Sequence, residues 1–250
     1  MWVEKLTITN IKCFQEQTIS FALRGARGKK ALPYPWITLL GENGVGKSTI
    51  LQALALLLAG PEAAKELLPR PTGLVRVSSQ PGKLSAVIHQ EPGDGGIFGE
   101  NRVREAFSFS YSVSGDANVL IRQETYTEPA LIEDPSRMLS WLRTNAFASR
   151  STGWFAAGYG AFRRLTRVSQ VLIPSLDPPA RAGNFATQFD EDRALSSFER
   201  WMVYLDYRIA KDVNDTQAKH MRTLGESAIT RLLPGKVRVA EVTSDGLIQF

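Results

Sequence analysis

Three features of the sequence predict an α/β fold. The first is an apolar run over residues 36–40, followed by a glycine-rich loop and then, over 47–58, by apolar residues at helical spacing. The second is a series of short runs of strand composition between residues 74 and 127, broken by glycine and proline. The third is a 3.6-residue apolar period that begins at Asp192. Together they predict a mixed core sheet, an antiparallel side sheet and a helical segment.

The N-terminal elements follow from composition and spacing. Residues 2–9 and 17–22 have strand composition and are joined by a short connection. The run WITLL at 36–40 is apolar throughout, which is typical of a central strand buried on both faces. Residues 47–58 form a helix that Gly60-Pro61 ends. This helix carries apolar side chains at Ile50, Leu51, Leu54, Leu57 and Leu58.

The middle of the chain changes character. Residues 74–127 contain the runs VRV, LSAVIH, AFSFSYSV and VLIRQETYT, which predict an antiparallel meander. Residues 136–143 are expected to form a short helix, and GWFAAGY at 153–159 is a second candidate for a buried strand. Residues 160–191 contain three prolines and little periodicity, so we expect an irregular loop there.

Two helices and a hairpin are expected in the C-terminal part. Apolar residues share one helical face at Leu195, Phe198, Trp201, Met202, Leu205 and Ile209, and again at Ala218, Met221, Leu224, Ile229 and Leu232. Pro234-Gly235 ends the second helix, and the runs around Asp245-Gly246 predict a hairpin. Because Phe250 closes an apolar strand, we expect either that the chain continues or that this strand docks into something.

Composition excludes several function classes. Of the 250 residues, 43% are apolar and 22% charged, as in average globular proteins. Cys13 is the only cysteine and there are two histidines, so neither a disulfide nor a zinc cluster is expected. No signal peptide or membrane span is recognisable, which predicts a cytoplasmic protein without a membrane partner. The net charge of +5 permits an anionic partner such as a nucleotide or nucleic acid.

Residues 41–48 read GENGVGKS and fit the phosphate-binding pattern G-x-x-x-x-G-K-[ST]. Glycines let the backbone approach the phosphates, and successive N–H groups form an anion-binding nest at a helix N-terminus. Lys47 supplies a charge for the β- and γ-phosphates, and Ser48 a hydroxyl ligand for Mg²⁺. The predicted ATP site therefore comprises Gly41, Asn43, Gly44, Val45, Gly46, Lys47, Ser48 and Thr49.

A first strand ending in NIKCF at 10–14, a second strand and then WITLLGENGVGKST resemble the start of the SMC, RecF, Rad50 and OLD-type ATPases, the ABC-class AAA ATPases of DNA repair and anti-phage defence. The GEN form of the loop is typical of this family, and GYGAFRRL at 158–165 resembles its compact, defence-associated members. The resemblance implies an N-terminal lobe of an ABC-type ATPase over 1–165, with 166–250 as a loop, two-helix segment and hairpin of the same incomplete domain. It also implies a nucleotide contact for Lys12.

Three parts of the family pattern are absent from the sequence or altered in it. Neither the signature loop nor a Walker B strand ending in Asp-Glu is found. Two runs resemble a Walker B strand only superficially: LIED at 131–134 is short and precedes a proline, and MVYLD at 202–206 lies on a predicted helical face. Gln90 is a poor substitute for the glutamine of the family's Q-loop. By resemblance, ATP is sandwiched between the phosphate-binding loop of one subunit and the signature loop of another. We therefore expect half of an ATPase site, completed by a further part of the chain or by a second polypeptide.

Basic residues outside the loop are candidates for contacts with DNA phosphates or with the bound nucleotide. They form two groups, Arg24, Arg27, Lys29 and Lys30 in a glycine-containing loop, and Arg163, Arg164 and Arg167 after the second buried strand. A solvated loop is the ordinary alternative for the first group.

The expected function is ATP binding with Mg²⁺, and hydrolysis when the complementary half is present. By resemblance, binding drives a homodimer or higher oligomer, coupled to DNA repair or to phage defence through an effector nuclease. One alternative is a scaffold that binds ATP without turnover and assembles such a complex. A transporter ATPase is disfavoured because the adenine-stacking aromatic residue and Q-loop are missing, and a P-loop kinase because no lid arginines are recognisable.

Overall fold

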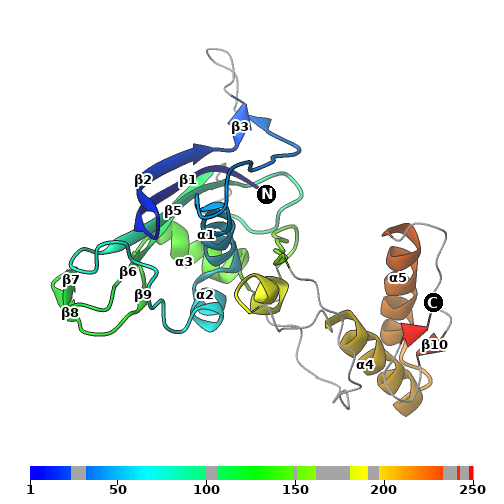
Figure 1. Ribbon diagram of the computed structural model, residues 1–250. Helices are drawn as coiled ribbons and strands as arrows, with labels where there is room; N and C mark the ends of the chain where they lie inside the picture. The colour runs from blue at the N-terminus through cyan, green and yellow to red at the C-terminus, as the bar shows by residue number, and fades with distance from the viewer. Residues whose placement is uncertain are drawn as a thin grey trace.

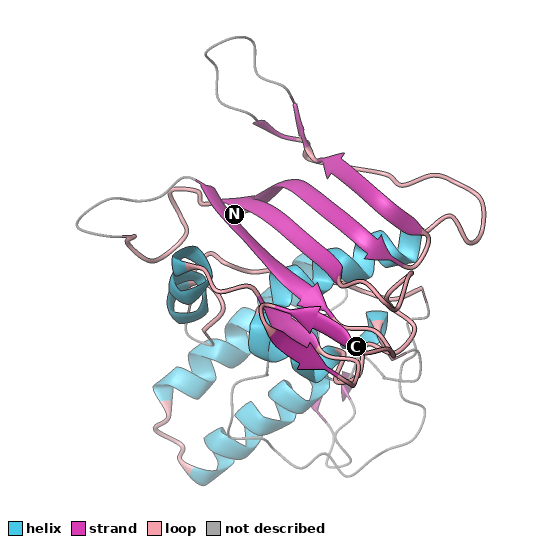
Figure 2. Ribbon diagram, turned by 90° about the vertical axis from the view of Figure 1, so that its left-hand side faces the viewer, coloured by secondary structure: helices cyan, strands magenta, loops and turns pink. Residues whose placement is uncertain are grey.

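A five-stranded antiparallel sheet lies at the centre of the fold (Figure 2). The computed structural model describes residues 1–23, 32–98, 106–148, 151–161, 181–190, 197–232, 241–242 and 248–249. The strand order is β2 (Phe14–Ser20), β1 (Trp2–Ile11), β5 (Gly82–His89), β6 (Ala106–Val113) and β9 (Leu131–Glu133). Two small hairpins pair β3 (Ala22–Leu23) with β4 (Leu32–Pro33), and β7 (Val119–Ile121) with β8 (Glu124–Tyr126).

Side chains of alternating character give the sheet one buried face. Apolar residues at every second position of β1, β5 and β6 are buried, as the two-residue strand period requires. In the register, Leu6 of β1 lies opposite Ala86 of β5, which in turn lies opposite Phe109 of β6. Helix α1 (Lys47–Ala59) packs against β5, and α3 (Arg137–Asn145) against β6, so helices cover the apolar face (Figure 1). The predicted helix after the glycine-rich loop is thus confirmed. The runs LSAVIH and AFSFSYSV are antiparallel strands as predicted, but they belong to the central sheet and not to a separate side sheet, and VRV at 75–77 forms only an isolated bridge at Val75.

The C-terminal end of α1 is held by a cation. Gly60 has φ +88, where α1 ends and α2 (Pro61–Leu67) begins. Arg181, in a short 3₁₀ turn at Arg181–Asn184, donates from Nε and Nη2 to the Leu58 carbonyl at 3.1 and 2.9 Å, and from Nη1 to Ala146. Burial lowers the pKa of the Arg181 guanidinium. A cation at a helix C-terminus interacts favourably with the exposed carbonyls and the helix dipole.

Removing this cation should destabilise the fold. We expect Arg181→Ala to lower the free energy of unfolding by about 2–3 kcal/mol, because the carbonyls of Leu58 and Ala146 lose a charged donor. Thermal or urea unfolding measures the change. Arg137→Ala is the matched control, since Arg137 lies 5.5 Å over the Phe98 ring without capping a helix. Equal losses in both variants would contradict the capping role.

The predicted C-terminal helices are present as a helical hairpin. These are α4 (Ser197–Lys211) and α5 (Thr216–Leu232), which pack on one another around a small core of Met202, Leu205 and Ala218. Leu224, expected on the apolar face of α5, is instead 51% exposed. The predicted hairpin is seen in β10 (Glu241–Val242) pairing with β11 (Ile248–Gln249).

Two predicted central strands are not strands. Residues 36–40 are extended, but within the described residues they pair with no strand, and Trp36 and Leu40 are 84% and 89% exposed. Residues 153–159 are likewise irregular: Trp154 is buried, but Phe155 is 75% exposed. All described strand pairs are antiparallel, so the prediction of a mixed core sheet is wrong for the described part of the chain. The physical reason is that neither apolar run has a neighbouring strand to bond.

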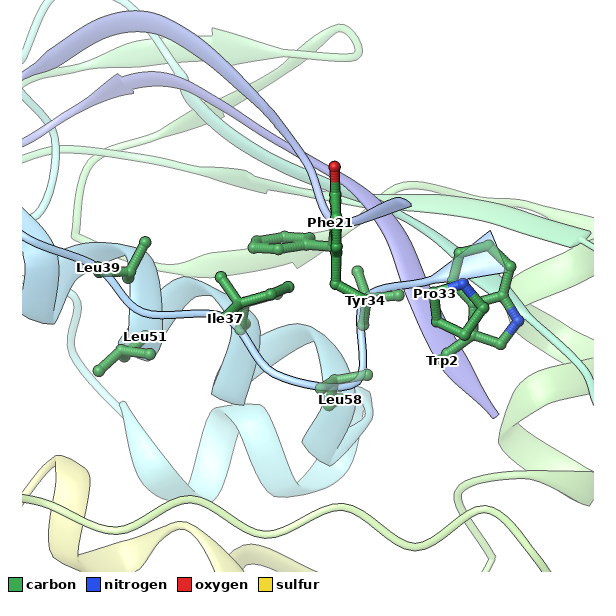
Figure 3. A pocket seen from close by; sticks show the side chains of 10 residues that line it. Trp2, Phe21, Pro33, Tyr34, Ile37, Leu39, Leu51 and Leu58 are labelled. Carbon is green, nitrogen blue, oxygen red and sulfur yellow. The ribbon is translucent and has the colours of Figure 1, made fainter. Parts of the chain in front are cut away.

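Part of the run at 36–40 covers a groove beside α1. Ile37 and Leu39 point toward Leu51 and Leu58 of α1, and β1 closes the other side through Trp2 (Figure 3). The groove encloses about 260 Å³ and its lining is apolar apart from the hydroxyl of Tyr34 and the indole nitrogen of Trp2. Trp36 and Leu40 do not line it.

Large apolar side chains exposed within one short run, such as those of Trp36 and Leu40, promote association. We expect the protein to self-associate at high concentration, and Trp36→Glu or Leu40→Glu to shift it toward monomer in light scattering. Leu120→Glu is the matched control, because Leu120 is 66% exposed in the β7–β8 hairpin. An unchanged mass in the Trp36 and Leu40 variants would contradict this expectation.

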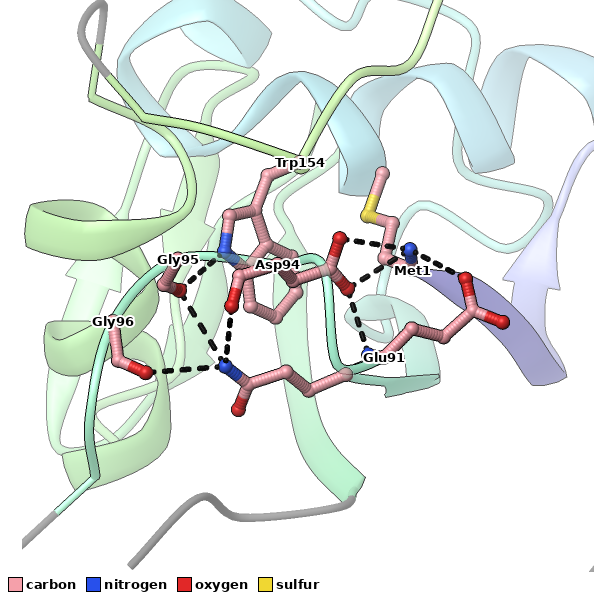
Figure 4. Close-up of polar contacts among 7 residues, drawn as sticks. Met1, Glu91, Asp94, Gly95, Gly96 and Trp154 are labelled. Atoms are coloured by element: carbon pink, nitrogen blue, oxygen red, sulfur yellow. Dashed lines mark hydrogen bonds and ion pairs between the residues drawn. The ribbon is translucent and has the colours of Figure 1, made fainter. Parts of the chain in front are cut away.

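The loop after β5 is tied to the start of β1 and to Trp154 (Figure 4). Gln90 is buried, and its amide donates to the carbonyls of Asp94, Gly95 and Gly96. Trp154 donates its indole N–H to Gly95, and the Met1 amino group lies 2.9 Å from the Asp94 carboxylate. Gln90 is thus used to hold this loop, which agrees with its poor fit to a Q-loop. Among the described helices none is long and apolar enough to cross a membrane.

Candidate functional site

The glycine-rich loop lies between residue 40 and the first turn of α1. Gly44 and Gly46 have φ angles of +85° and +99°, in the left-handed region that glycine adopts without strain. Gly46 caps α1 through its carbonyl, which accepts from Ile50 at 3.0 Å, while no side chain caps the helix N-terminus. The first N–H groups of α1 therefore stay available to an anionic group, as a phosphate-binding helix requires.

Lys47 folds back over this loop. Its Nζ donates to the carbonyls of Gly41 at 2.8 Å and Glu42 at 2.6 Å. Carbonyl oxygens neutralise an ammonium only in part, so the charge remains available to a stronger acceptor such as a phosphate oxygen. Ser48 and Thr49 follow in the first turn of α1, where Thr49 is buried. The predicted residues 41–49 therefore lie together as one loop and helix start.

The turn between β1 and β2 packs against the loop. A Cβ on Gly46 would lie 2.5 Å from both Cys13 Sγ and the ring of Phe14, so only glycine fits here. This contact places the turn that carries Lys12 beside the glycine-rich loop. Lys12 itself has φ +45, an uncommon conformation for a residue with a side chain. The structure thus brings Lys12 to the predicted site.

Two residues that the sequence did not predict join the site. Arg76 donates from Nη1 to the Cys13 carbonyl at 3.2 Å, which adds a second cation at the β1–β2 turn. Asn10 is buried at the end of β1 and bonds to the segment that carries Arg76. Their sequence signals were weak: Arg76 lies in the run VRV, which was expected to be a strand, and Asn10 is a single polar residue before the turn.

A pocket of about 130 Å³ opens beside the loop. Lys12 and Leu74 line one side, Thr49 and Gln52 of α1 another, and Phe189 closes it. Gln52 also donates to the Gln188 carbonyl at 2.9 Å, which ties α1 to the turn at Ala186–Gln188. The pocket combines apolar walls with hydroxyl, amide and ammonium groups, a lining suited to a small organic ligand.

The acidic residues of LIED at 131–134 are paired away from the loop. Burial tends to raise the pKa of Glu133, but Lys65 at 2.7 Å and Arg143 hold it below its usual range. Burial also tends to raise the pKa of Asp134, but hydrogen bonds from Ser110, Arg122 and Ser112 hold that pKa below its usual range. Both carboxylates are therefore already satisfied at the β9 edge of the sheet.

Asp206, at the end of MVYLD, lies in α4, as its helical spacing predicted. It pairs with Arg222 of α5 at 2.6 Å. The described residues contain no cluster of three His, Cys, Asp or Glu side chains that could hold a metal ion. The basic candidates Arg24, Arg27, Lys29, Lys30, Arg163, Arg164 and Arg167 lie outside the described residues.

Comparison with known proteins agrees with this geometry. Residues 5–127 match a family model described as an AAA domain. Over 69 residues the chain is 44% identical to the Septu protein PtuA of Bacillus mycoides strain KBAB4. That alignment covers 28% of this chain and 9% of the relative, so the shared segment is a small part of the longer protein. The two matches support an AAA ATPase of the ABC class.

Proposed function

We propose that this chain is an ATP-binding subunit of SMC, RecF or OLD-like type. The observation that carries the proposal is the loop at 41–48, where two left-handed glycines, an uncapped helix start and the Lys47 ammonium converge. The AAA match over residues 5–127, a range that includes this loop, also supports it.

Each residue of the loop has a role in this proposal. Backbone N–H groups between Gly41 and Gly46 bind the phosphate oxygens, and Lys47 neutralises the β- and γ-phosphates. Ser48 is the ligand of Mg²⁺, and Thr49 places a hydroxyl near the α-phosphate. When bound there, Mg²⁺ would supply charge neutralisation for the phosphates. Lys12 adds a cation from the β1–β2 turn.

Hydrolysis requires a carboxylate or a glutamine that orients water, and the acidic residues of the two Walker B candidates, LIED at 131–134 and MVYLD at 202–206, are engaged in ion pairs. These residues are Glu133, Asp134 and Asp206. The proposal is therefore a half-site, with ATP sandwiched between two subunits in a homodimer or higher oligomer. In this proposal residues 1–165 form the nucleotide-binding lobe and 166–250 continue the same incomplete domain.

The task coupled to ATP is proposed from the resemblance to repair and defence ATPases and from the match to a Septu protein. Anti-phage defence with an effector nuclease is favoured over DNA repair, because the curated match is to the Septu protein. The ion pairs of Glu133, Asp134 and Asp206 also favour a second candidate function. In it, the chain binds ATP without turnover and assembles the complex as a sensor.

The proposed function is tested with a fluorescent ATP analogue, mant-ATP, and with a phosphate-release assay. We expect saturable binding that is stronger with Mg²⁺ than with EDTA, and no turnover by these 250 residues. Turnover would show that the site is complete in the chain. Absence of any binding, in protein that unfolds cooperatively, would overturn the proposal.

Ser48→Ala should remove the magnesium dependence of this binding. We expect mant-ATP affinity with Mg²⁺ to fall about tenfold, to the level measured in EDTA, because the hydroxyl ligand is lost. Titrations with Mg²⁺ and with EDTA measure both values. Ser140→Ala is a control, since that hydroxyl lies on α3 and donates to Ser136. A magnesium effect that survives in Ser48→Ala would contradict the assigned ligand.

A further inference from the structure

Asn10 has an unusual conformation at the end of β1. Its side chain is buried, with 7% of the residue exposed, and its φ is +53. Lys12, two residues later, has φ +45. Non-glycine residues adopt this region at a cost of about 1–2 kcal/mol each, so surrounding contacts must hold the turn in place.

The Asn10 side chain provides these contacts. Its Nδ2 donates to the carbonyls of Val77, Gln80 and Pro81 at 3.1, 2.9 and 3.3 Å, and its Oδ1 accepts from the Val77 N–H at 2.9 Å. A primary amide is the one short side chain that both donates twice and accepts, and asparagine also tolerates a positive φ. The residue type is thus matched to the position.

The backbone extends the same connection on both sides of Asn10. The Asn10 carbonyl accepts from the N–H of Arg76 at 3.1 Å, and the Lys12 N–H donates to Leu74 at 2.8 Å. Arg76 returns to the turn through its bond to the Cys13 carbonyl. The segment 74–81 and the turn at 11–13 therefore form one unit, although they are more than 60 residues apart in sequence.

This unit contacts the phosphate-binding loop at Gly46. Cys13 and Phe14 close the space above Gly46 so tightly that a Cβ would not fit. We infer that Asn10 is a positioning residue for the nucleotide site. It holds the Lys12–Cys13 turn against the loop, so that the Lys12 side chain is already in place to contact the nucleotide when it binds. The inference rests on the proposed function.

Two variants separate positioning from folding. Asn10→Asp keeps the shape and the tolerance of positive φ but turns the donors into acceptors that face three carbonyls. Asn10→Gly keeps the backbone conformation and removes the side chain, and it is the second variant if the first unfolds. We expect mant-ATP affinity to fall about tenfold in both, measured well below the unfolding midpoint.

The matched control is Gln90→Ala, which removes a buried amide that donates to the carbonyls of Asp94, Gly95 and Gly96, at the opposite end of β5 from Asn10. It should lower the unfolding midpoint and leave mant-ATP affinity unchanged. A loss of affinity in Gln90→Ala equal to that in the Asn10 variants would overturn the inference, because affinity would then follow stability alone.

A double-mutant cycle tests the route through Lys12. In a Lys12→Ala background, Asn10→Gly should reduce mant-ATP affinity by less than about twofold, because the group that Asn10 positions is gone. A full and independent loss in that background would overturn the inference. If the wild type binds no mant-ATP, the proposed function fails and this inference fails with it, whereas wild-type affinity in the Asn10 variants overturns the inference alone.

Discussion

Lys47→Ala is expected to raise the dissociation constant of mant-ATP at least about 100-fold and to leave the fold intact. The ammonium is the charge that the loop itself contributes, and it lies within hydrogen-bond distance of the two loop carbonyls of Gly41 and Glu42. Its loss removes the strongest electrostatic contact to the phosphates. These carbonyls lie at the surface and can bond to water, so the free energy of unfolding should change by less than about 1 kcal/mol.

Equilibrium binding and thermal unfolding of the same preparation measure both effects. Lys65→Ala is the matched control, because Lys65 is an exposed lysine of α2 whose Nζ pairs with Glu133 at 2.7 Å. It should bind mant-ATP like the wild type. Lys47→Arg should recover little affinity, since a planar guanidinium cannot occupy the compact ammonium position inside the loop. Unchanged affinity in Lys47→Ala would refute the assignment of the loop as the nucleotide site.

Local spacing predicted the loop, the helix after it and two strands of the meander. The pattern at 41–48 specifies a glycine-rich turn before a helix, and α1 begins at Lys47 as expected. Alternation of apolar and polar residues gave β5 and β6, because each strand buries every second side chain against α1 or α3. These elements are set by interactions within or next to the element itself.

The two runs that were expected as central strands, at 36–40 and 153–159, show that residue pattern alone does not determine strand pairing. A continuous apolar run such as 36–40 indicates a strand buried on both faces. Such burial also requires neighbouring strands and helices, and the residues of the run itself do not determine whether these are present. In the described residues α1 covers Ile37 and Leu39 on one side, and the opposite side stays open at Trp36 and Leu40.

The periphery of the site was predictable only in part. The resemblance to known ATPases predicted Lys12, and the structure brings its turn to Gly46. Arg76 and Asn10 were missed because their partners are 63 to 71 residues away, so no local pattern links them. Backbone carbonyls that are distant in sequence, such as those that accept from the Asn10 amide, cannot be recognised from residue types, because every residue has a carbonyl.

Gly46→Ala is expected to be the most damaging single change in the phosphate-binding loop. The residue has φ +99, and its added methyl would lie 2.5 Å from Cys13 Sγ and 2.5 Å from the nearest ring atom of Phe14. Backbone strain of about 1–2 kcal/mol adds to this overlap, so the loop or the β1–β2 turn must move. We expect a loss of about 3 kcal/mol in the free energy of unfolding and loss of mant-ATP binding.

Gly73→Ala separates the two causes. Gly73 also has a positive φ, +65, but nothing lies within 4 Å of the added Cβ. It should therefore show the strain alone, about 1 kcal/mol, with mant-ATP binding retained. Adding Cys13→Ala to Gly46→Ala removes one of the two overlaps and should restore part of the lost stability, since Cys13 is exposed and contributes little itself. Two results would contradict this expectation: equal stability of the Gly46 and Gly73 variants, or no recovery of stability in the double variant. Either would mean that the β1–β2 turn does not pack tightly against the loop, and the turn could then not position Lys12 at the nucleotide site.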